Sequence, residues 1–255
     1  MRRLPLNLFV LFIYLFLYTP IIILVLFSFN SKTFPAPWHS FTLHWYQELF
    51  KSAELWESFR NSLVVASTTT FMSLFFGACL IFFQSSGGKV RKFIPLFYGS
   101  LVIPETVLAV GLISYFSILH IPLGIVTLIV SHTVIGLGFV IPILFIRYLA
   151  LDPRLKEASL VLGASPMQTF FRITLPLLRP TMIASGLLIF VISFDDFILS
   201  YFCSGTEVQT LSIYLVNSLR FGISPVVNAL SALLLLLTAI LALIFFSPKI
   251  RTRIF

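Results

Sequence analysis

Charged residues are scarce in this chain. Only 10% of its 255 residues carry charge, whereas 58% are apolar, 29 are Phe and the mean hydropathy is +1.04. A soluble domain needs a charged surface, and no soluble core could bury so much apolar material. Runs of about 20 or more nearly uncharged residues recur, a length that crosses about 30 Å of hydrocarbon as a helix. The composition therefore predicts an all-α polytopic membrane protein and excludes a second soluble domain.

Cysteine is nearly absent as well, with only Cys79 and Cys203. Both are predicted to be small packing residues, because their places near opposite ends of two spans exclude a disulfide bond between them. The chain also lacks H-E-x-x-H, G-x-S-x-G and G-x-x-x-x-G-K-[ST]; the nearest echo of the last is Gly87-Gly88-Lys89. We therefore expect no enzyme activity, no ATP hydrolysis, no cofactor and no metal site.

Six apolar segments are long enough to be membrane spans, so residues 1–255 are predicted to form a single transmembrane domain. The first segment follows Met1-Arg2-Arg3. Its apolar run is longer than that of a signal peptide and no A-x-A-like site follows, so we expect a retained anchor. The six segments are Leu6–Phe29, Ser62–Phe83, Phe93–Leu119, Leu123–Ile146, Thr181–Phe202 and Val226–Phe246.

The basic residues are unevenly divided between the two sides that these spans define. With the N-terminus inside, thirteen of the seventeen Lys and Arg residues fall on the cytoplasmic side. This division fits the positive-inside rule with both termini in the cytoplasm. The net charge of +8 is then explained by topology and by contact with anionic lipid, so nucleic acid is not a predicted partner. The four bases outside are Lys32, Lys51, Arg60 and Arg220.

The segment from Arg147 to Pro180 is the long inner loop of this topology. Local rules predict a helix-turn-helix, in which each helix has a capping side chain followed by Pro, where the missing N–H costs nothing, and a glycine makes the turn. Two later prolines are expected to stop the second helix before the next span. These residues are, in order, Asp152 with Pro153, Gly163, Ser165 with Pro166, and then Pro176 and Pro180.

Each of the two short helices would have one apolar face, with charged residues around it. Such a pair is suited to docking a soluble protein. The alternative is a pair of interfacial helices that lie on anionic lipid. The apolar positions are Leu155, Ala158 and Leu162 in the first helix, and Met167, Phe170 and Phe171 in the second.

The same loop resembles the EAA motif, E-A-A-x3-G-x9-I-x-L-P, of membrane subunits of binding-protein-dependent ABC importers. The matching residues are Glu157-Ala158-Ser159, Gly163 and Ile173-Thr174-Leu175-Pro176. Every spacing agrees, and the one departure is Ser159, where the pattern prefers Ala. The resemblance implies that these helices couple to a separate ATP-hydrolysing subunit.

In that family the motif forms coupling helices that sit in a cleft of the ATPase subunit. The resemblance implies that Glu157 meets a basic group there and that Gly163 is the pivot between the helices. Ile173 and Pro176 would belong to the platform that returns to the membrane. Nucleotide-driven closure of soluble subunits could then move membrane helices.

Further stretches resemble spermidine/putrescine permeases of the PotC type, with less specific motifs. They are Pro20–Ser31, Ser193–Ser204 and Gly222–Leu230. The resemblance implies one half of a translocation path in a bacterial inner membrane. It also implies a cytoplasmic ATP-binding subunit that acts as a dimer, a second homologous permease and an external solute-binding protein. Permeases for aminoethylphosphonate, iron and other solutes share this frame, so the solute stays open.

Three acids, Glu105, Asp195 and Asp196, lie at membrane depth with no Lys or Arg in the spans. An ionised carboxylate there needs water, a partner or a passing ligand, so the three are candidates to line a path for cations such as polyamines. Pro104 should bend the third span. Asp195 and Asp196 are about 100° apart on a helix, so pairing of one with a partner subunit is the alternative.

One other interpretation of the acids remains open at this point. A secondary transporter or channel could use the same acids as an ion relay, but it would not need the inner helix-turn-helix.

His132, in the fourth span, stands among apolar residues. Such a histidine is predicted to be a hydrogen-bonded packing group rather than a transport residue.

Overall fold

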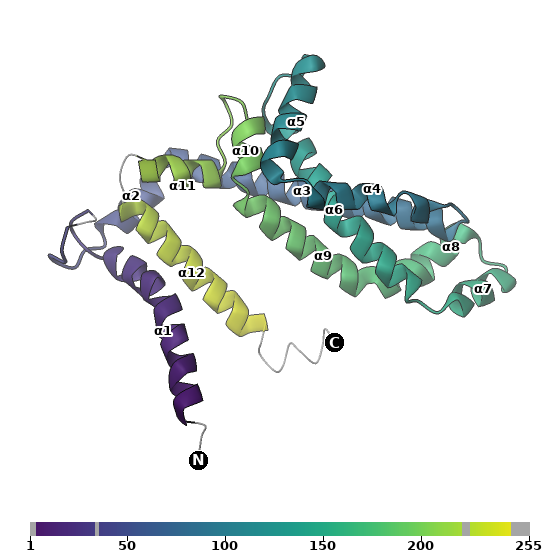
Figure 1. The fold of residues 1–255 in the computed structure, drawn as a ribbon, viewed down its shortest axis with the longest axis horizontal. Helices are drawn as coiled ribbons and strands as arrows, with labels where there is room; N and C mark the ends of the chain where they lie inside the picture. Colours follow the sequence, from purple (N-terminus) through teal and green to yellow (C-terminus); the bar gives the residue numbers. More distant parts are fainter. Residues whose placement is uncertain (1–3, 34–35, 221–224, 246–255) are drawn as a thin grey trace. The chain divides into compact units, whose positions relative to one another are not determined.

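The computed structural model describes residues 4–33, 36–220 and 225–245, and the regular elements within them are helices (Figure 1). The chain divides into two compact units. One comprises residues 1–55 and 215–255, and the other comprises residues 56–214. Two helices, α3 (Ala53–Ser85) and α11 (Leu211–Arg220), straddle the boundaries between these ranges.

The first unit contains α1 (Leu4–Phe27), α2 (His44–Lys51) and α12 (Pro225–Phe245), and α12 packs against both of the others. The aromatic segment between α1 and α2 is tied to the end of α1. Trp45 Nε1 donates to the carbonyl oxygen of Asn30 at 2.7 Å, and the hydroxyls of Ser28 and Tyr46 lie 2.8 Å apart. These bonds hold α2 beside the end of the first apolar helix.

The second unit is a bundle in which α6 packs against both α4 and α9, while α5 packs against α10. A short hairpin of α7 and α8 lies where α6 ends and the helix leading into α9 begins (Figure 1). Besides most of α3, the unit contains η1 (Val90–Lys92), α4 (Ile94–Val102), α5 (Glu105–Ile118), α6 (Ile125–Leu149), α7 (Pro153–Val161), α8 (Pro166–Thr169), η2 (Phe170–Thr174), α9 (Leu175–Asp195) and α10 (Ile198–Cys203).

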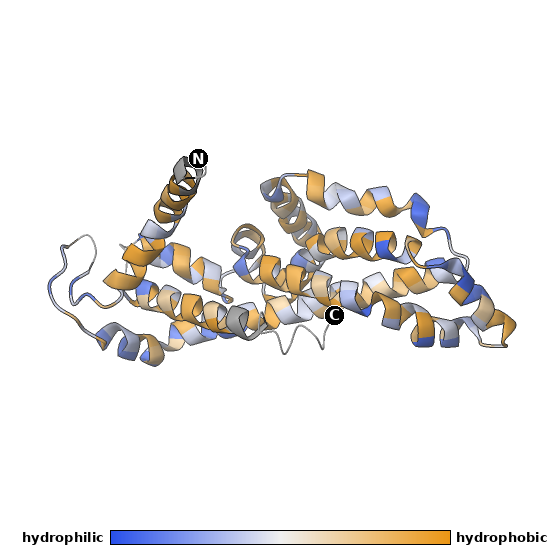
Figure 2. Ribbon diagram, turned by 90° about the horizontal axis from the view of Figure 1, so that it is seen from below, coloured by the Kyte–Doolittle hydropathy of each residue, from blue (hydrophilic) through white to orange (hydrophobic). Residues whose placement is uncertain are grey.

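Two apolar clusters form the core of this unit. The larger one lies towards the α7–α8 hairpin and joins α3, α4, α6 and α9 through residues such as Ile81, Val140 and Phe170. The smaller one includes Val65 and Cys203, so the prediction that Cys203 is a packing residue is confirmed. Cys79 is exposed on α3. Apolar residues make up most of the helices (Figure 2), and many of their side chains are exposed, as expected of helices that contact lipid.

Within the described residues, four helices are long and apolar enough to cross a membrane: Leu8–Phe27, Ala53–Ser85, Ile125–Leu149 and Pro166–Asp195. A fifth candidate is the pair Val90–Val102 and Glu105–Ile118, bent by 105°. The bend predicted at Pro104 is therefore confirmed. The sixth predicted segment, Val226–Phe246, falls on α12, of which Pro225–Ile240 is an apolar helix shorter than these spans, and Phe246 lies outside the described residues. The chain is an all-helical multi-pass membrane protein.

The fifth predicted segment, Thr181–Phe202, has different limits in the structure. The helix ends at Asp195, the backbone at Asp196 is extended, and α10 begins at Ile198. The acids expected inside a continuous helix therefore lie at a break between two helices. This break has a physical use, because it turns backbone and carboxylate groups at membrane depth towards polar partners.

The prediction that Pro176 and Pro180 stop the second hairpin helix was wrong. A single helical stretch of 30 residues runs from Pro166 to Asp195. The turn just before it reaches α9, Phe170–Thr174, is π-helical, and Pro176 follows in the first turn of α9. A π-turn already departs from the usual i→i−4 bonding, so a residue without an N–H is accommodated there. Pro180 lies inside α9, as membrane helices permit.

Candidate functional site

The hairpin of α7 and α8 forms as its sequence predicts. The Asp152 side chain accepts a hydrogen bond from Arg154 N at 2.9 Å, and α7 begins at Pro153. Ser165 Oγ accepts from Gln168 N at 3.2 Å while Gln168 Oε1 accepts from Ser165 N at 2.9 Å, which makes a capping box. Both predicted helix starts are confirmed.

The turn between the two helices depends on Gly163, whose φ is +86°. No atom lies within 4 Å of the position that a Cβ would occupy, so a side chain there would be strained by the backbone alone. We expect Gly163→Ala to destabilise the hairpin by about 1–2 kcal/mol, the cost of the left-handed region for an L residue. Co-purification of the ATP-binding subunit should fall. Gly163→Asn, which tolerates this conformation, should retain more of it; equal losses would contradict a conformational role.

Ser159, which departs from the EAA pattern, links the two helices. Its hydroxyl lies 2.9 Å from Thr169 Oγ1, and both residues are buried. An Ala at this position could not make that bond. The motif, which treats Ser159 as a small substitute for Ala, therefore did not predict this hydrogen bond between α7 and the end of α8.

We expect Ser159→Ala to lower the free energy of unfolding by about 1 kcal/mol, the usual net value of one hydrogen bond plus the cost of leaving Thr169 without its partner. Uptake should stay near normal, because the family pattern has Ala here. Thermal unfolding of the purified protein measures the first effect. The double variant S159A/T169V should be no less stable than S159A. If the two substitutions lowered the free energy of unfolding additively, the role of this hydrogen bond would be contradicted.

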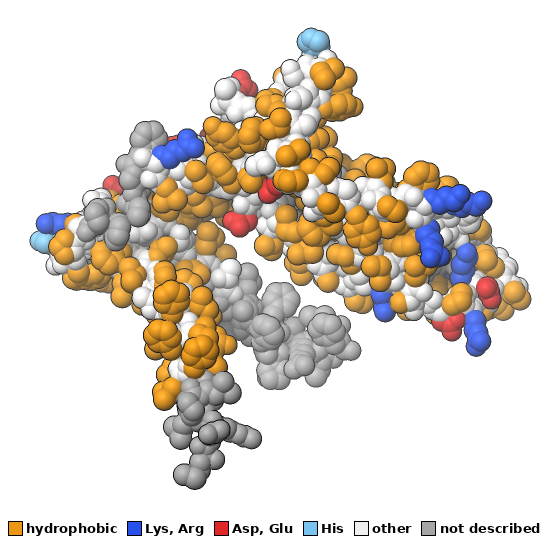
Figure 3. All heavy atoms as spheres, in the orientation of Figure 1, with side chains coloured by type: hydrophobic (Ala, Val, Ile, Leu, Met, Phe, Trp, Pro, Cys, Tyr) orange, Lys and Arg blue, Asp and Glu red, His pale blue; other side chains and the backbone are white. Residues whose placement is uncertain are grey.

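The outer surface of the hairpin is apolar and is not covered by the rest of the described chain. Val161 and Leu162 are each 87% exposed, and Glu157 and Ala158 are exposed on the same helix. Of the second helix, Phe170 turns into the core. A groove beside α7 is lined by Glu157 together with Asp152, Lys156, Leu160, Ile173 and others. Lys and Arg side chains gather at this end of the second unit (Figure 3), and Pro176 is exposed nearby.

Lys156 ties α7 to another membrane helix. Its ammonium group donates to the carbonyl oxygen of Ser85, the last residue of α3. A cation at that end of a helix is favourable, because the last carbonyls carry negative partial charge. The hairpin is therefore connected to two spans, to α3 through Lys156 and to α9 through continuous helix.

A second site lies at the break after α9. Glu105 is the first residue of α5, directly after the Pro104 bend, and α5 packs against α10. Glu105 and Asp196 are close enough for their carboxyl groups to interact. The Asp196 side chain is only 7% exposed, and its Oδ1 accepts from Ser200 N at 3.0 Å. Asp195, in contrast, is exposed, so the structure brings together two of the three predicted acids.

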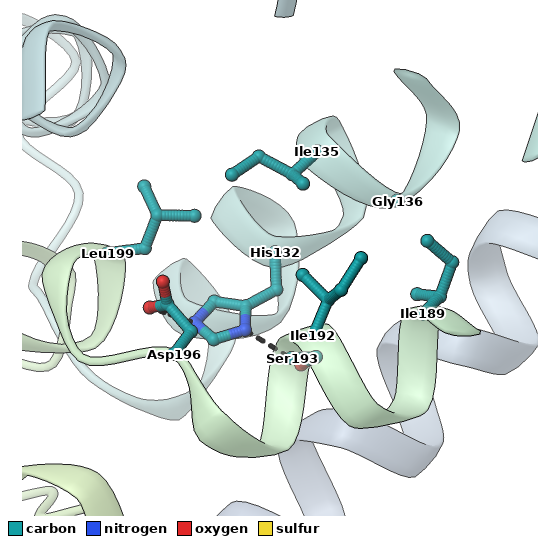
Figure 4. A pocket seen from close by; sticks show the side chains of 8 residues that line it. All are labelled: His132, Ile135, Gly136, Ile189, Ile192, Ser193, Asp196 and Leu199. Atoms are coloured by element: carbon teal, nitrogen blue, oxygen red, sulfur yellow. Dashed lines mark hydrogen bonds and ion pairs between the residues drawn. The ribbon is translucent and has the colours of Figure 1, made fainter. Parts of the chain in front are cut away.

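His132 joins this site from α6 (Figure 4). Its Nδ1 lies 2.7 Å from Ser193 Oγ, and its Nε2 lies 3.5 Å from Asp196 Oδ1 and 3.4 Å from Ser200 Oγ. The prediction of a hydrogen-bonded histidine is confirmed. Its link to Asp196 was missed, because nothing in the sequence pairs residues 64 positions apart; the available signal was that a buried imidazole needs polar partners.

Sequence comparison decides the family. No protein-family model matches the chain. It is 33% identical to the spermidine/putrescine transport system permease protein PotC of Escherichia coli K12, over 91% of this chain and 88% of that protein. It is 33% identical to PotC of Haemophilus influenzae, over 97% and 96% of the two chains. The chain belongs to the PotC family of ABC transporter permeases. The putrescine transport system permease protein PotI of Escherichia coli is 30% identical, over 86% and 82%.

Solved structures share the fold of this permease. A bacterial ABC transporter involved in the import of the acidic polysaccharide alginate matches with a TM-score of 0.70 and 17% identity, over 98% of this chain and 95% of that chain. The MetNI methionine ABC transporter matches with a TM-score of 0.55 and 19% identity, over 80% and 99%. The permease is the transport component of its ABC system and not the catalytic ATPase.

Proposed function

We propose that this permease forms half of the path by which an ATP-driven importer carries a small polyamine, spermidine or putrescine, into the cell. The proposal rests on the relatives PotC and PotI, whose names specify these solutes. The observation that carries it in the structure is the pair of neighbouring carboxylates, Glu105 and Asp196, at a break between apolar helices. An acidic lining favours cations over oxyanions.

The chemistry of a polyamine suits this lining. Its ammonium groups are separated by short methylene chains, so one group can contact a carboxylate while the methylenes contact apolar or aromatic side chains. Asp195 is exposed next to the buried Asp196, which supports a transient contact with a cation. We assign Glu105, Asp195 and Asp196 to the substrate path.

The α7–α8 hairpin is the proposed contact with the ATP-binding subunit. Its exposed apolar surface and the exposed carboxylate of Glu157 are suited to a matching cleft with a basic group. Ala158, Ser159 and Gly163 shape the hairpin. Ile173 and Pro176 lie where it continues towards α9.

The complete assembly follows from this assignment. We propose six spans with both termini in the cytoplasm of a bacterial inner membrane, a second and homologous permease, an ATP-binding dimer and an external solute-binding protein. One chain of this size supplies half of a central cavity, so a partner permease is needed to close the path. The basic end of the second unit, which carries the hairpin, would face the cytoplasm.

Uptake by the complete transporter in proteoliposomes tests the proposal. Radiolabelled spermidine or putrescine should accumulate only when ATP, the ATP-binding subunit and the binding protein are all present. Unlabelled polyamine should compete, whereas sulfate and aminoethylphosphonate should not. Uptake that survives omission of the ATP-binding subunit and collapses with the proton gradient would instead support a secondary transporter.

A further inference from the structure

The imidazole ring of His132 contacts residues on both sides of the break between α9 and α10. His132 belongs to α6, whereas its three partners lie at the end of α9 (Ser193), in the linker (Asp196) and in α10 (Ser200). The histidine is 3% exposed and the Asp196 side chain 7% exposed. A second link fixes the linker backbone, since Ser212 Oγ donates to the carbonyl oxygen of Asp196 at 2.5 Å.

The partners determine how the ring is used. Oδ1 of Asp196 accepts a hydrogen bond from Ser200 N, so it is an acceptor, and we assign the ring proton to Nε2, the nitrogen that faces it. The other nitrogen, Nδ1, then accepts from the hydroxyl of Ser193. This arrangement leaves the imidazole neutral and gives each ring nitrogen one defined role.

Two groups lie against the same oxygen of Asp196. Ser200 N donates to Oδ1 at 3.0 Å, and His132 Nε2 lies 3.5 Å from it. The carboxyl group also interacts with that of Glu105, which comes from α5 on another side. Carboxylate rotation about its terminal torsion is otherwise broad, so two donors on one oxygen set the direction of the second.

The cavity on the α6 side of this cluster has room for about one water molecule, about 10 Å³. Its lining combines His132, Ser193 and Asp196 with apolar side chains from α6, α9 and α10 (Figure 4). A polyamine cannot enter so small a space. A cation must therefore reach Asp196 from elsewhere, and the packing of α5 against α10 places Glu105 on such a side.

We propose that His132 is a positioning residue for cation transport, which together with Ser200 holds Oδ1 of Asp196 so that Oδ2 faces a protonated amine. The inference rests on the proposed function. It assigns His132 no contact with the solute. Its effect passes through Asp196 and is therefore expected in the affinity of the path for amines.

Two substitutions separate the contacts of His132. His132→Gln places an N–H near the position of Nε2 and keeps the contact with Asp196. His132→Asn reaches only the position of Nδ1, so it keeps the contact with Ser193 and loses that with Asp196. The complete transporter, reconstituted in proteoliposomes, is assayed for initial uptake across a range of putrescine concentrations, together with the amount of assembled complex. Thr133→Val is the matched control, because the Thr133 hydroxyl bonds only its own helix, at Ile129 O.

We expect H132N to raise the half-saturating putrescine concentration about tenfold, because it loses the polar contact that holds the Asp196 carboxyl group. H132Q should stay within about threefold of the unchanged protein, and T133V should not change the value. Equal half-saturating values for H132N and H132Q, with only assembly lowered, would show that His132 merely packs. Failure of the unchanged protein to carry putrescine would overturn the proposed function together with this inference.

Discussion

Glu157→Lys should abolish polyamine uptake and reduce co-purification of the ATP-binding subunit at least tenfold. Glu157 is exposed on α7, one turn before Val161 and Leu162, which are each 87% exposed. The charge reversal would set a cation against the basic group expected in the ATPase cleft, and like charges placed together at an interface cost several kcal/mol. Tagged permease can be purified from membranes and the retained ATPase subunit measured, beside ATP-driven uptake in proteoliposomes.

Glu207→Lys is the matched control for this experiment. Glu207 is an exposed acid in the turn after α10, outside the α7–α8 hairpin. The same charge reversal there should leave capture of the ATP-binding subunit normal. Both variants should insert normally into the membrane. A Glu157→Lys permease that binds the ATPase subunit and transports at the normal rate would remove Glu157 from the coupling contact.

Asp195→Asn combined with Asp196→Asn should raise the half-saturating polyamine concentration tenfold or more. Each substitution removes one carboxyl group at the break between α9 and α10. Removing one partner of a desolvated contact between an ammonium group and a carboxylate typically costs about 2–5 kcal/mol of binding free energy. A cost of about 1.4 kcal/mol already lowers affinity tenfold. Concentration-dependent uptake in proteoliposomes measures the change, and ATP-binding subunit capture should be unaffected.

The two single variants should differ. Asp196 is buried and contacts Glu105 and His132, so its loss should have the larger effect on affinity; Asp195 is exposed and should contribute less. Glu207→Gln removes a charge elsewhere and should leave the half-saturating concentration unchanged. A double variant that saturates at the normal polyamine concentration would end the argument for an acidic path, although the family assignment would stand.

The sequence predicted the parts of the hairpin that depend on near neighbours. Asp152, Ser165 and Gly163 cap or turn a helix within four residues of their own position, so local chemistry determines them. The same local rules failed at Pro176, since they assume α-helical bonding. The π-turn of Phe170–Thr174 changes that bonding, and no local sequence rule predicts such a turn.

Contacts between distant segments could not be predicted in this way. Glu105, His132 and Asp196 come from α5, α6 and the linker after α9, which meet only after the bundle has packed, and the break after Asp195 exists only in that context. The sequence did identify the acids as candidates, because an unpartnered charge at membrane depth is costly. Which of them pair, and which one stays exposed, is set by packing.

The continuous helical stretch from Pro166 to Asp195 joins the proposed ATPase contact at one end to the proposed substrate path at the other. Its 30 residues, at 1.5 Å each, have a length of about 45 Å along the helix axis, which exceeds the roughly 30 Å thickness of the hydrocarbon layer. Tilting such a rod by about 10° about one end moves the other end by about 8 Å. Under the proposed coupling, a modest rotation of the hairpin by the ATP-binding subunit would displace Asp195 by more than the size of an ammonium group, provided that the π-turn of Phe170–Thr174 and the helix at Pro180 keep their shape.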